Sequence, residues 1–183
     1  MFFMDAKAET VERLTERLDK AARLRASARA DAASIRKRAL LRQWQADRLA
    51  RTHADLLEDQ RYTAAARFFL DEIYGVKDNA KRDADIVRVV PTMTKFLPVA
   101  GLETVADAVD LDAISEDLDA ALGSALGKKI DAIDPVAYGV AYRAVGRRPE
   151  RERQLDLIEH LGHALDRLTR GAFAGTALKL MRK

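Results

Sequence analysis

The chain has 183 residues, of which 48% are hydrophobic and 33% are charged, a balance typical of a folded globular protein and not of a disordered one. It contains no cysteine, which excludes disulfide frameworks, thiolate metal sites and cysteine nucleophiles. The net charge of +3 is uneven: Lys and Arg outnumber Asp and Glu 13 to 7 over 1–51 and 10 to 5 over 135–183, whereas the acids lead 17 to 9 over 52–134. We expect these segments to pair with one another, inside the fold or across a dimer, in preference to meeting a polyanion.

The first residues, MFFMDAKAET, become charged too soon to form the apolar region of a signal peptide, and they lack its basic leader. No run of about 18 uncharged apolar residues occurs, so we predict no membrane span. These features and the lack of cysteine predict a cytoplasmic protein.

Residues 1–74 contain neither glycine nor proline, the two residues that break helices most strongly, and this favours long helices. From Val11 to Ala39 apolar residues follow a 3-4 spacing with one interruption, which is typical of a heptad seam. Because the seam is rich in alanine and buries little area, we expect it to lie against its own domain or against a second copy of the chain. We therefore predict a long basic N-terminal helix over 1–45, through which a homodimer could form, and a helical bundle over 46–183.

Capping residues and helix breakers delimit the later elements. They predict a helix of about 60–74 between Asp59 and Gly75, and, after a turn at 76–83, a helix that Pro91 stops or kinks. Two further helices are predicted from Pro98 to about Leu111 and from Ser115 to Gly123 or Gly127. The last predicted helices run from Pro135 to Gly146, after the cap Asp134, and from Pro149 to Gly171, and a short C-terminal piece follows. The sequence therefore predicts an all-α fold, a single-domain bundle of seven to eight helices.

The stretch RYTAAARFFLDEIYG, residues 61–75, contains the candidate site. On a helical wheel Glu72 falls between Phe68 and Phe69, so its carboxylate needs a cation, several hydrogen-bond donors or a raised pKa. We favour an ion pair with Arg82 that fixes how two helices dock, over an acid poised for chemistry in a pocket. The residues of this candidate pocket or buried polar network are His53, Arg61, Tyr62, Phe69, Glu72 and Arg82.

The spans THADLLEDQRYTAAARFFLDEIYG and RDADIVRVVPTMTKFLP resemble an uncharacterised group of bacterial proteins named for an FFLEELY motif. Residues 68–74 of this chain read FFLDEIY, with the first acid shortened and one leucine replaced by isoleucine. The resemblance extends over residues 48–122 and implies an α-helical bacterial protein. It implies no activity.

His160 and His163 stand three apart on one predicted helix, and Glu159 or Asp166 could add oxygen ligands to a metal site. Carboxylate-bridged di-metal bundles need a Glu-x-x-His motif on each of two helices, and that pattern is missing from the sequence. We therefore favour ordinary boundary histidines and predict no metal or other cofactor.

Residues 20–42 hold eight Lys and Arg against one acid, Asp31, a pattern that suits contact with phosphates. Trp44 is the one aromatic residue close to them, so we favour a solvated or docked helix face over nucleic-acid binding.

The sequence shows no phosphate-binding glycine loop and no hydrolase motif. We therefore predict a non-catalytic helical binding or scaffold module that self-associates and binds an unidentified protein partner. Two alternatives stay open: an enzyme or small-ligand-binding protein with a pocket around His53, Glu72 and Arg82, and nucleic-acid binding through the basic helix 20–42.

Overall fold

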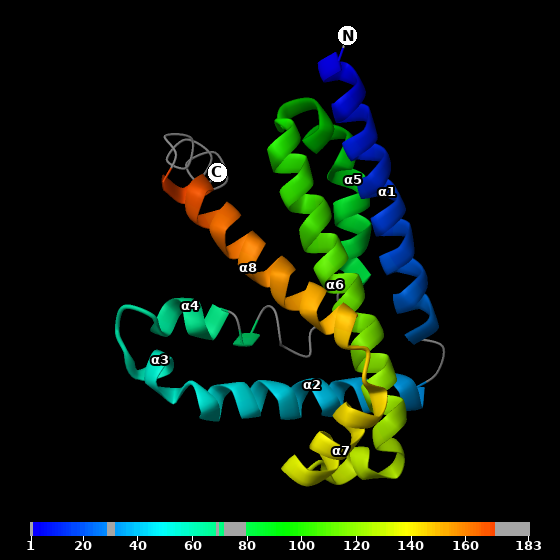
Figure 1. Ribbon diagram of the computed structural model, residues 1–183, viewed down its shortest axis with the longest axis vertical. Helices are drawn as coiled ribbons and strands as arrows, with labels where there is room; N and C mark the ends of the chain where they lie inside the picture. Colours follow the sequence, from blue (N-terminus) through cyan, green and yellow to red (C-terminus); the bar gives the residue numbers. More distant parts are fainter. Residues whose placement is uncertain (1, 29–31, 69, 72–79, 171–183) are drawn as a thin grey trace. The chain divides into compact units, whose positions relative to one another are not determined.

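The computed structural model of the chain describes residues 2–28, 32–68, 70–71 and 80–170 (Figure 1). These residues form eight α-helices and one 3-10 helix, with no strand among them, which confirms the predicted all-α class. The elements are α1 (Phe2–Ala28), α2 (Ala32–Thr52), α3 (Ala54–Glu58), α4 (Thr63–Phe68), α5 (Ala80–Phe96), α6 (Val99–Leu126), the 3-10 helix η2 (Gly127–Ala132), α7 (Pro135–Val145) and α8 (Arg148–Arg170).

The chain divides into two compact units. Unit 1 comprises residues 1–22, 87–115 and 147–183, and unit 2 comprises residues 23–86 and 116–146. Unit 2 therefore contains α2, α3, α4, η2, α7 and the C-terminal part of α6. The predicted helical segment 1–45 is described as two helices, α1 and the first part of α2, and the predicted boundary near residue 45 falls inside α2.

Helix α6 corrects the predicted break between Leu111 and Ser115, because it continues without interruption from Val99 to Leu126. Ser115 does not begin a helix: its hydroxyl donates to the carbonyl of Leu111 at 2.7 Å, one turn earlier in the same helix. The helix gives way to η2 at Gly127, whose φ of +54° is a conformation that glycine adopts at low cost.

The predicted limits of α7 are confirmed. The side chain of Asp134 accepts hydrogen bonds from the backbone N–H groups of Val136 and Ala137, both at 2.8 Å, and Pro135 is the first helical residue. Gly146 follows the last helical residue with a φ of +62°. Local cap and stop chemistry therefore positions this short helix.

Two other predicted limits differ from the structure. Helix α5 continues through Pro91 to Phe96, so the proline does not stop it, and the alternative, a kink at Pro91, stays a prediction. The helix expected over about 60–74 is described as α4, which begins only at Thr63, because the Asp59 side chain accepts from the backbone N–H of Arg61 at 2.9 Å in a turn before the helix. Its predicted stop, Gly75, and the predicted stop of α8, Gly171, lie outside the described residues.

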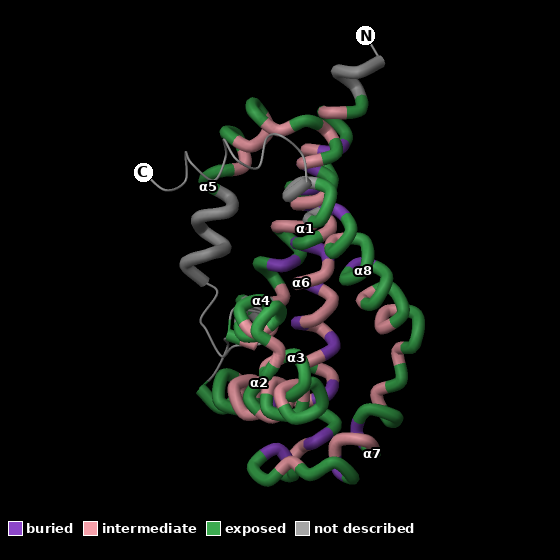
Figure 2. Tube along the Cα trace, turned by 90° about the vertical axis from the view of Figure 1, so that its left-hand side faces the viewer, coloured by how far each residue is buried: buried purple, intermediate pink, exposed green. Residues whose placement is uncertain are grey.

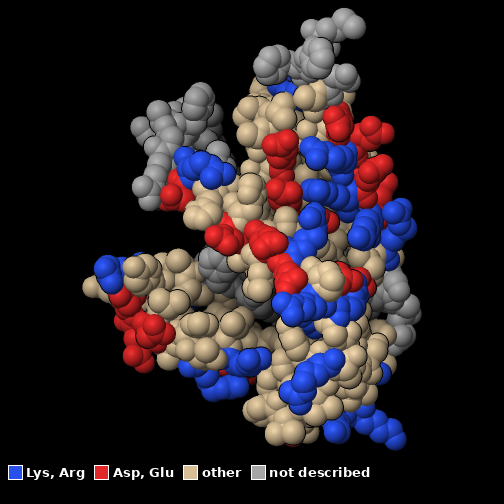
Figure 3. All heavy atoms as spheres, in the orientation of Figure 1, with Lys and Arg blue, Asp and Glu red and all other residues tan. Residues whose placement is uncertain are grey.

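Unit 1 has an apolar core formed by α1, α6 and α8. Leu14 and Ala21 of the predicted heptad seam are no more than 1% exposed, so these residues are covered within a single chain. Around the core, Arg17 bonds Asp107 through Nη1 and Oδ1 at 3.1 Å, and Arg153 pairs with Asp110. Figure 3 shows basic and acidic side chains next to one another over these helices.

Unit 2 has a core of its own, and Figure 2 shows buried positions recurring along α6. Its buried residues come from α2, α6, η2 and α7, and they are Leu41, Leu122, Leu126, Ile130, Ala137 and Ala141. This core holds α2 and α7 in place and so positions the site described next. None of the described helices is both long and apolar enough to cross a membrane.

Candidate ligand-binding site

A buried ion-pair network joins α2 to α6 within unit 2. Arg38 Nη1 lies 2.8 Å from Glu116 Oε2, and Arg42 also pairs with Glu116, whose side chain is only 3% exposed. Arg42 Nε lies 3.7 Å from Asp119 Oδ2, which gives this network two cations and two carboxylates. The basic α2 therefore meets acids of the 52–134 segment inside the fold, as the charge distribution predicts.

Gln45 links this network to α7. Its Nε2 donates to Asp119 Oδ1 at 3.1 Å and lies 3.5 Å from the Tyr138 hydroxyl. Burial raises the pKa of Asp119, an effect that outweighs the hydrogen bond from Gln45 and the attraction of Arg42. The Gln45 side chain thus connects the buried carboxylate of Asp119 to the hydroxyl of Tyr138.

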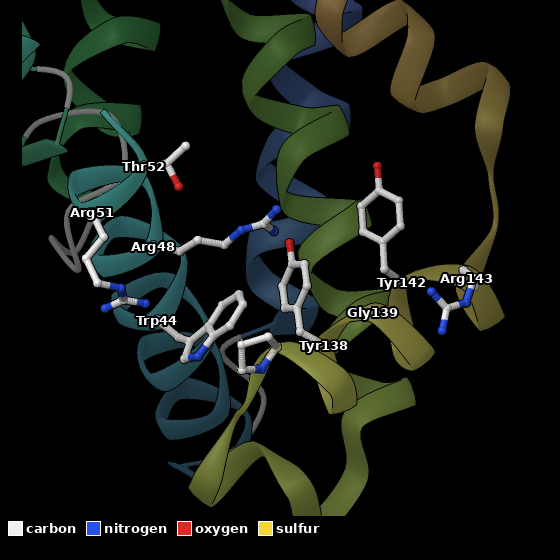
Figure 4. Close-up of a pocket in the computed structure, with 9 residues that line it drawn as sticks. Trp44, Arg48, Arg51, Thr52, Tyr138, Gly139, Tyr142 and Arg143 are labelled. Carbon is white, nitrogen blue, oxygen red and sulfur yellow. The ribbon is translucent and has the colours of Figure 1, made fainter. Parts of the chain in front are cut away.

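Three aromatic rings from two helices form a row beside this connection (Figure 4). Trp44 of α2 stacks on Tyr138 of α7 with ring centroids 4.3 Å apart and an interplanar angle of 25°, and the Tyr142 ring lies 6.1 Å beyond Tyr138. The guanidinium of Arg48 lies 5.9 Å from the Trp44 ring centroid and 5.3 Å from that of Tyr138. Four-residue spacing places Trp44 with Arg48, and Tyr138 with Tyr142, on one face of each helix.

A cavity of about 580 Å³ adjoins the rings. Its lining residues are Trp44, Arg48, Arg51, Thr52, Pro135, Tyr138, Gly139, Tyr142 and Arg143. Three of them are arginines and none is an acid. In Figure 4, Arg48 extends toward the rings, while Arg51 and Arg143 lie on opposite sides of the row.

The three arginines of the cavity are exposed, and each lacks an acidic partner among the described residues. Within the described part of the chain, no carboxylate forms an ion pair with Arg48, Arg51 or Arg143. The first N–H groups of α7 cannot serve an incoming anion either, because Asp134 already occupies them. The arrangement therefore suits a ligand with a planar ring and an anionic group that the arginines hold.

The residues of the sequence-predicted pocket lie elsewhere. His53 precedes α3 and is exposed, and Tyr62 is 47% exposed. Arg61 pairs with Asp59 at 2.9 Å, a bond that lowers the pKa of Asp59, and its guanidinium lies 5.0 Å from the Tyr62 ring.

The other three members of that set lie wholly or partly outside the described residues. Phe69 and Glu72 lie outside the described residues, and of Arg82 only its place in α5 is described. The predicted pair between Glu72 and Arg82 therefore stays a prediction.

The two histidines singled out in the sequence have separate acidic neighbours. His160 Nε2 lies 3.5 Å from Asp107 Oδ2, and His163 Nε2 lies 3.7 Å from Glu159 Oε1. Among the residues that the structure describes, no group of three or more His, Cys, Asp or Glu side chains could hold a metal ion.

Sequence reasoning noticed Trp44 but missed its partners Tyr138 and Tyr142. The available signal was the four-residue spacing of Tyr138 and Tyr142 on the short helix after Asp134 and of Trp44 and Arg48 on α2. Nothing local in either helix indicates that the other helix lies opposite it.

A family model described as "Domain of unknown function (DUF8198)" matches residues 24–183. The chain belongs to this family. The match includes α2 and α7 and so covers every residue that lines the cavity. No curated protein and no solved structure matches the chain.

Proposed function

We propose that this family member is a helical binding module whose unit 2 cavity holds a small anionic ligand. The observation that carries the proposal is the set of three arginines, Arg48, Arg51 and Arg143, which line one cavity without ion-pair partners among the described residues. A guanidinium presents a planar fork of N–H donors that matches a carboxylate or a phosphate with two parallel hydrogen bonds. Such cations placed around apolar rings supply both attraction and orientation for a ligand.

The basic stretch 20–42 and the predicted site around His53, Glu72 and Arg82 have less support as binding sites. Three arginines of the basic stretch 20–42 form ion pairs, because Arg36 Nη1 lies 2.6 Å from Asp131 and both Arg38 and Arg42 meet Glu116. Three of the eight basic residues in this stretch therefore contact acids within unit 2. Neither a site around His53, Glu72 and Arg82 nor membership of the FFLEELY group is tested by the described residues, and both stay predictions.

Trp44 is the single tryptophan of the chain, so its fluorescence reports directly on this cavity. We expect pyrophosphate to change the fluorescence saturably at low ionic strength and to bind more weakly as salt is added. Arg48→Gln and Arg143→Gln should each weaken binding roughly tenfold or more, because each variant loses a charged hydrogen bond. Calorimetry checks the affinities without relying on Trp44.

Arg36→Gln is the matched control, since Arg36 lies on the same helix but pairs with Asp131 and does not line the cavity. Its affinity for pyrophosphate should equal that of the natural chain. An absence of saturable binding, or an equal loss in Arg36→Gln and Arg48→Gln, would contradict the proposal.

We also propose that residues 1–45 mediate self-association. The supporting observation is Ile35 on α2, a residue of the predicted heptad seam whose side chain is 52% exposed. Ile35 therefore offers an apolar side chain for contact with a second copy of the same helix.

A further inference from the structure

We infer that the ligand of the unit 2 cavity is a nucleotide, with its phosphates on the arginines and its base against the aromatic row. This inference rests on the proposed function, because it assumes that the cavity binds an anion. It adds the chemical class of the ligand.

The ring row offers aromatic surface on which a nucleic-acid base can stack, outside the faces that Trp44 and Tyr138 already cover on each other. Tyr138 lies between Trp44, at 4.3 Å, and Tyr142, at 6.1 Å, and these rings are inclined by 25° and 29° respectively. Tyr142 is 39% exposed, so part of its side chain is accessible to a ligand. Bases stack on aromatic side chains and on guanidinium planes, and this contact tolerates any base because every base has a π face.

The cations fit a phosphate better than a carboxylate. A carboxylate carries a single negative charge, whereas a phosphate monoester carries about −1.5 to −2 near neutral pH, and a diphosphate carries more. The three arginines around the cavity carry three positive charges, more than the single negative charge of an aromatic carboxylate can neutralise.

The positions of two side chains on α2 also support a nucleotide as the ligand. Arg48 is held beside the Trp44 and Tyr138 rings, so its guanidinium is oriented before a ligand arrives. Thr52 lies four residues later and lines the cavity, where its hydroxyl can donate to a phosphate or a ribose oxygen. The cavity volume of about 580 Å³ lies within the range of small-molecule sites.

The test compares ligands that contain one or both parts of a nucleotide. Pyrophosphate supplies only the anion, adenosine only the base and sugar, and ADP and UDP supply both. Trp44 fluorescence and calorimetry measure the affinities. We expect ADP or UDP to bind at least about tenfold more tightly than pyrophosphate, as base stacking predicts, and adenosine to bind more weakly than either nucleotide.

Variants of Tyr142 test the stacking contact. Tyr142→Leu should weaken nucleotide binding about tenfold more than it weakens pyrophosphate binding, and Tyr142→Phe should restore the difference because it keeps the ring. Circular dichroism and thermal melting confirm that each variant is folded, and Arg36→Gln serves again as the control outside the cavity.

The outcomes separate the inference from the proposed function. If pyrophosphate binds as tightly as both nucleotides, the nucleotide inference is overturned while the anion site survives. If neither pyrophosphate nor a nucleotide binds, both fail. A short single-stranded oligonucleotide distinguishes the source: tighter binding than ADP assigns the site to the nucleotide units of a strand, and weaker binding assigns it to free nucleotides.

Discussion

At the scale of single residues, Glu116 and Asp119 show how unit 2 accommodates buried charge. Glu116 meets two arginines from α2, whereas Asp119 has one arginine at 3.7 Å and an amide donor at 3.1 Å. Two carboxylates three residues apart on α6 therefore have unequal compensation. The weaker compensation at Asp119 is consistent with the dominance of burial in raising its pKa.

The raised pKa of Asp119 has a consequence for stability. Above pH 3.8 the folded chain retains a proton on Asp119 that the unfolded chain has released. The stabilising contribution of Asp119 to the unfolding free energy is therefore fully present below pH 3.8 and is lost as the pH rises through the folded pKa. An asparagine at this position does not titrate, so only the natural chain loses this contribution as the pH rises. We therefore expect the unfolding free energy of Asp119→Asn, minus that of the natural chain, to increase between about pH 4 and pH 7. Urea denaturation at each pH measures this difference.

The slope is the informative quantity, because any hydrogen bond lost in Asp119→Asn adds an offset that does not change with pH. Gln45→Leu provides a second check: it removes a bond that lowers the pKa of Asp119, so the loss of stability should extend to higher pH. A difference that stays flat across the range would show that burial does not raise this pKa.

At the scale of elements, the effect of a glycine depends on its backbone conformation, as Gly146 and Gly162 show. Gly146 ends α7 with φ +62° and ψ −111°, a conformation that residues with a Cβ atom rarely adopt. Gly162 lies inside α8, where an added Cβ atom meets nothing within 4 Å. The same substitution should therefore have opposite effects at the two positions.

We expect Gly146→Ala to lower the unfolding free energy by about 1–3 kcal/mol because of backbone strain. Gly162→Ala should raise it by about 0.5–1 kcal/mol, because alanine loses less conformational freedom in a helix and has room for its methyl group. Thermal or urea denaturation of the two variants against the natural chain measures both values. Destabilisation by Gly162→Ala would contradict the open surroundings at that position.

The elements also show where local reasoning is sufficient and where it fails. The beginning and end of α7 were predicted because Asp134 and Gly146 act on their own neighbours along the chain. The break expected before Ser115 was wrong because a serine that follows an apolar turn can bond backward to Leu111 as readily as it can cap a new helix. Which of these two bonds forms depends on whether the preceding residues remain helical.

At the scale of the whole molecule, the proposed self-association determines the mass of the protein in solution. Self-association through residues 1–45 predicts a mass twice the 20.4 kDa of one chain. Leu14 and Ala21 are buried in a single chain, whereas Ile35 is exposed, so we place the contact on the part of the seam around Ile35. We expect Ile35→Lys to reduce the mass to that of one chain, as native mass spectrometry at low and high salt can show.

A natural chain that has the mass of one copy at micromolar concentration would contradict self-association. Leu155→Lys is the matched control for the variant, because Leu155 is also exposed, at 66%, but lies on α8 in unit 1. Its mass should equal that of the natural chain. Equal dissociation in both variants would show that the added charge acts without regard to position.

The sequence by itself determined that the chain is all-α, where α7 begins and ends, and that basic and acidic segments would attract one another. These properties follow from interactions between residues a few positions apart and from the total charge of each segment. Only the tertiary structure decided that Trp44 stacks on Tyr138, that Gln45 reaches both Asp119 and Tyr138, and that three arginines share one cavity. The physical reason is that Gln45 and Tyr138 are 93 positions apart, so their approach depends on the packing of α2, α6 and α7 around a common core and not on any local preference.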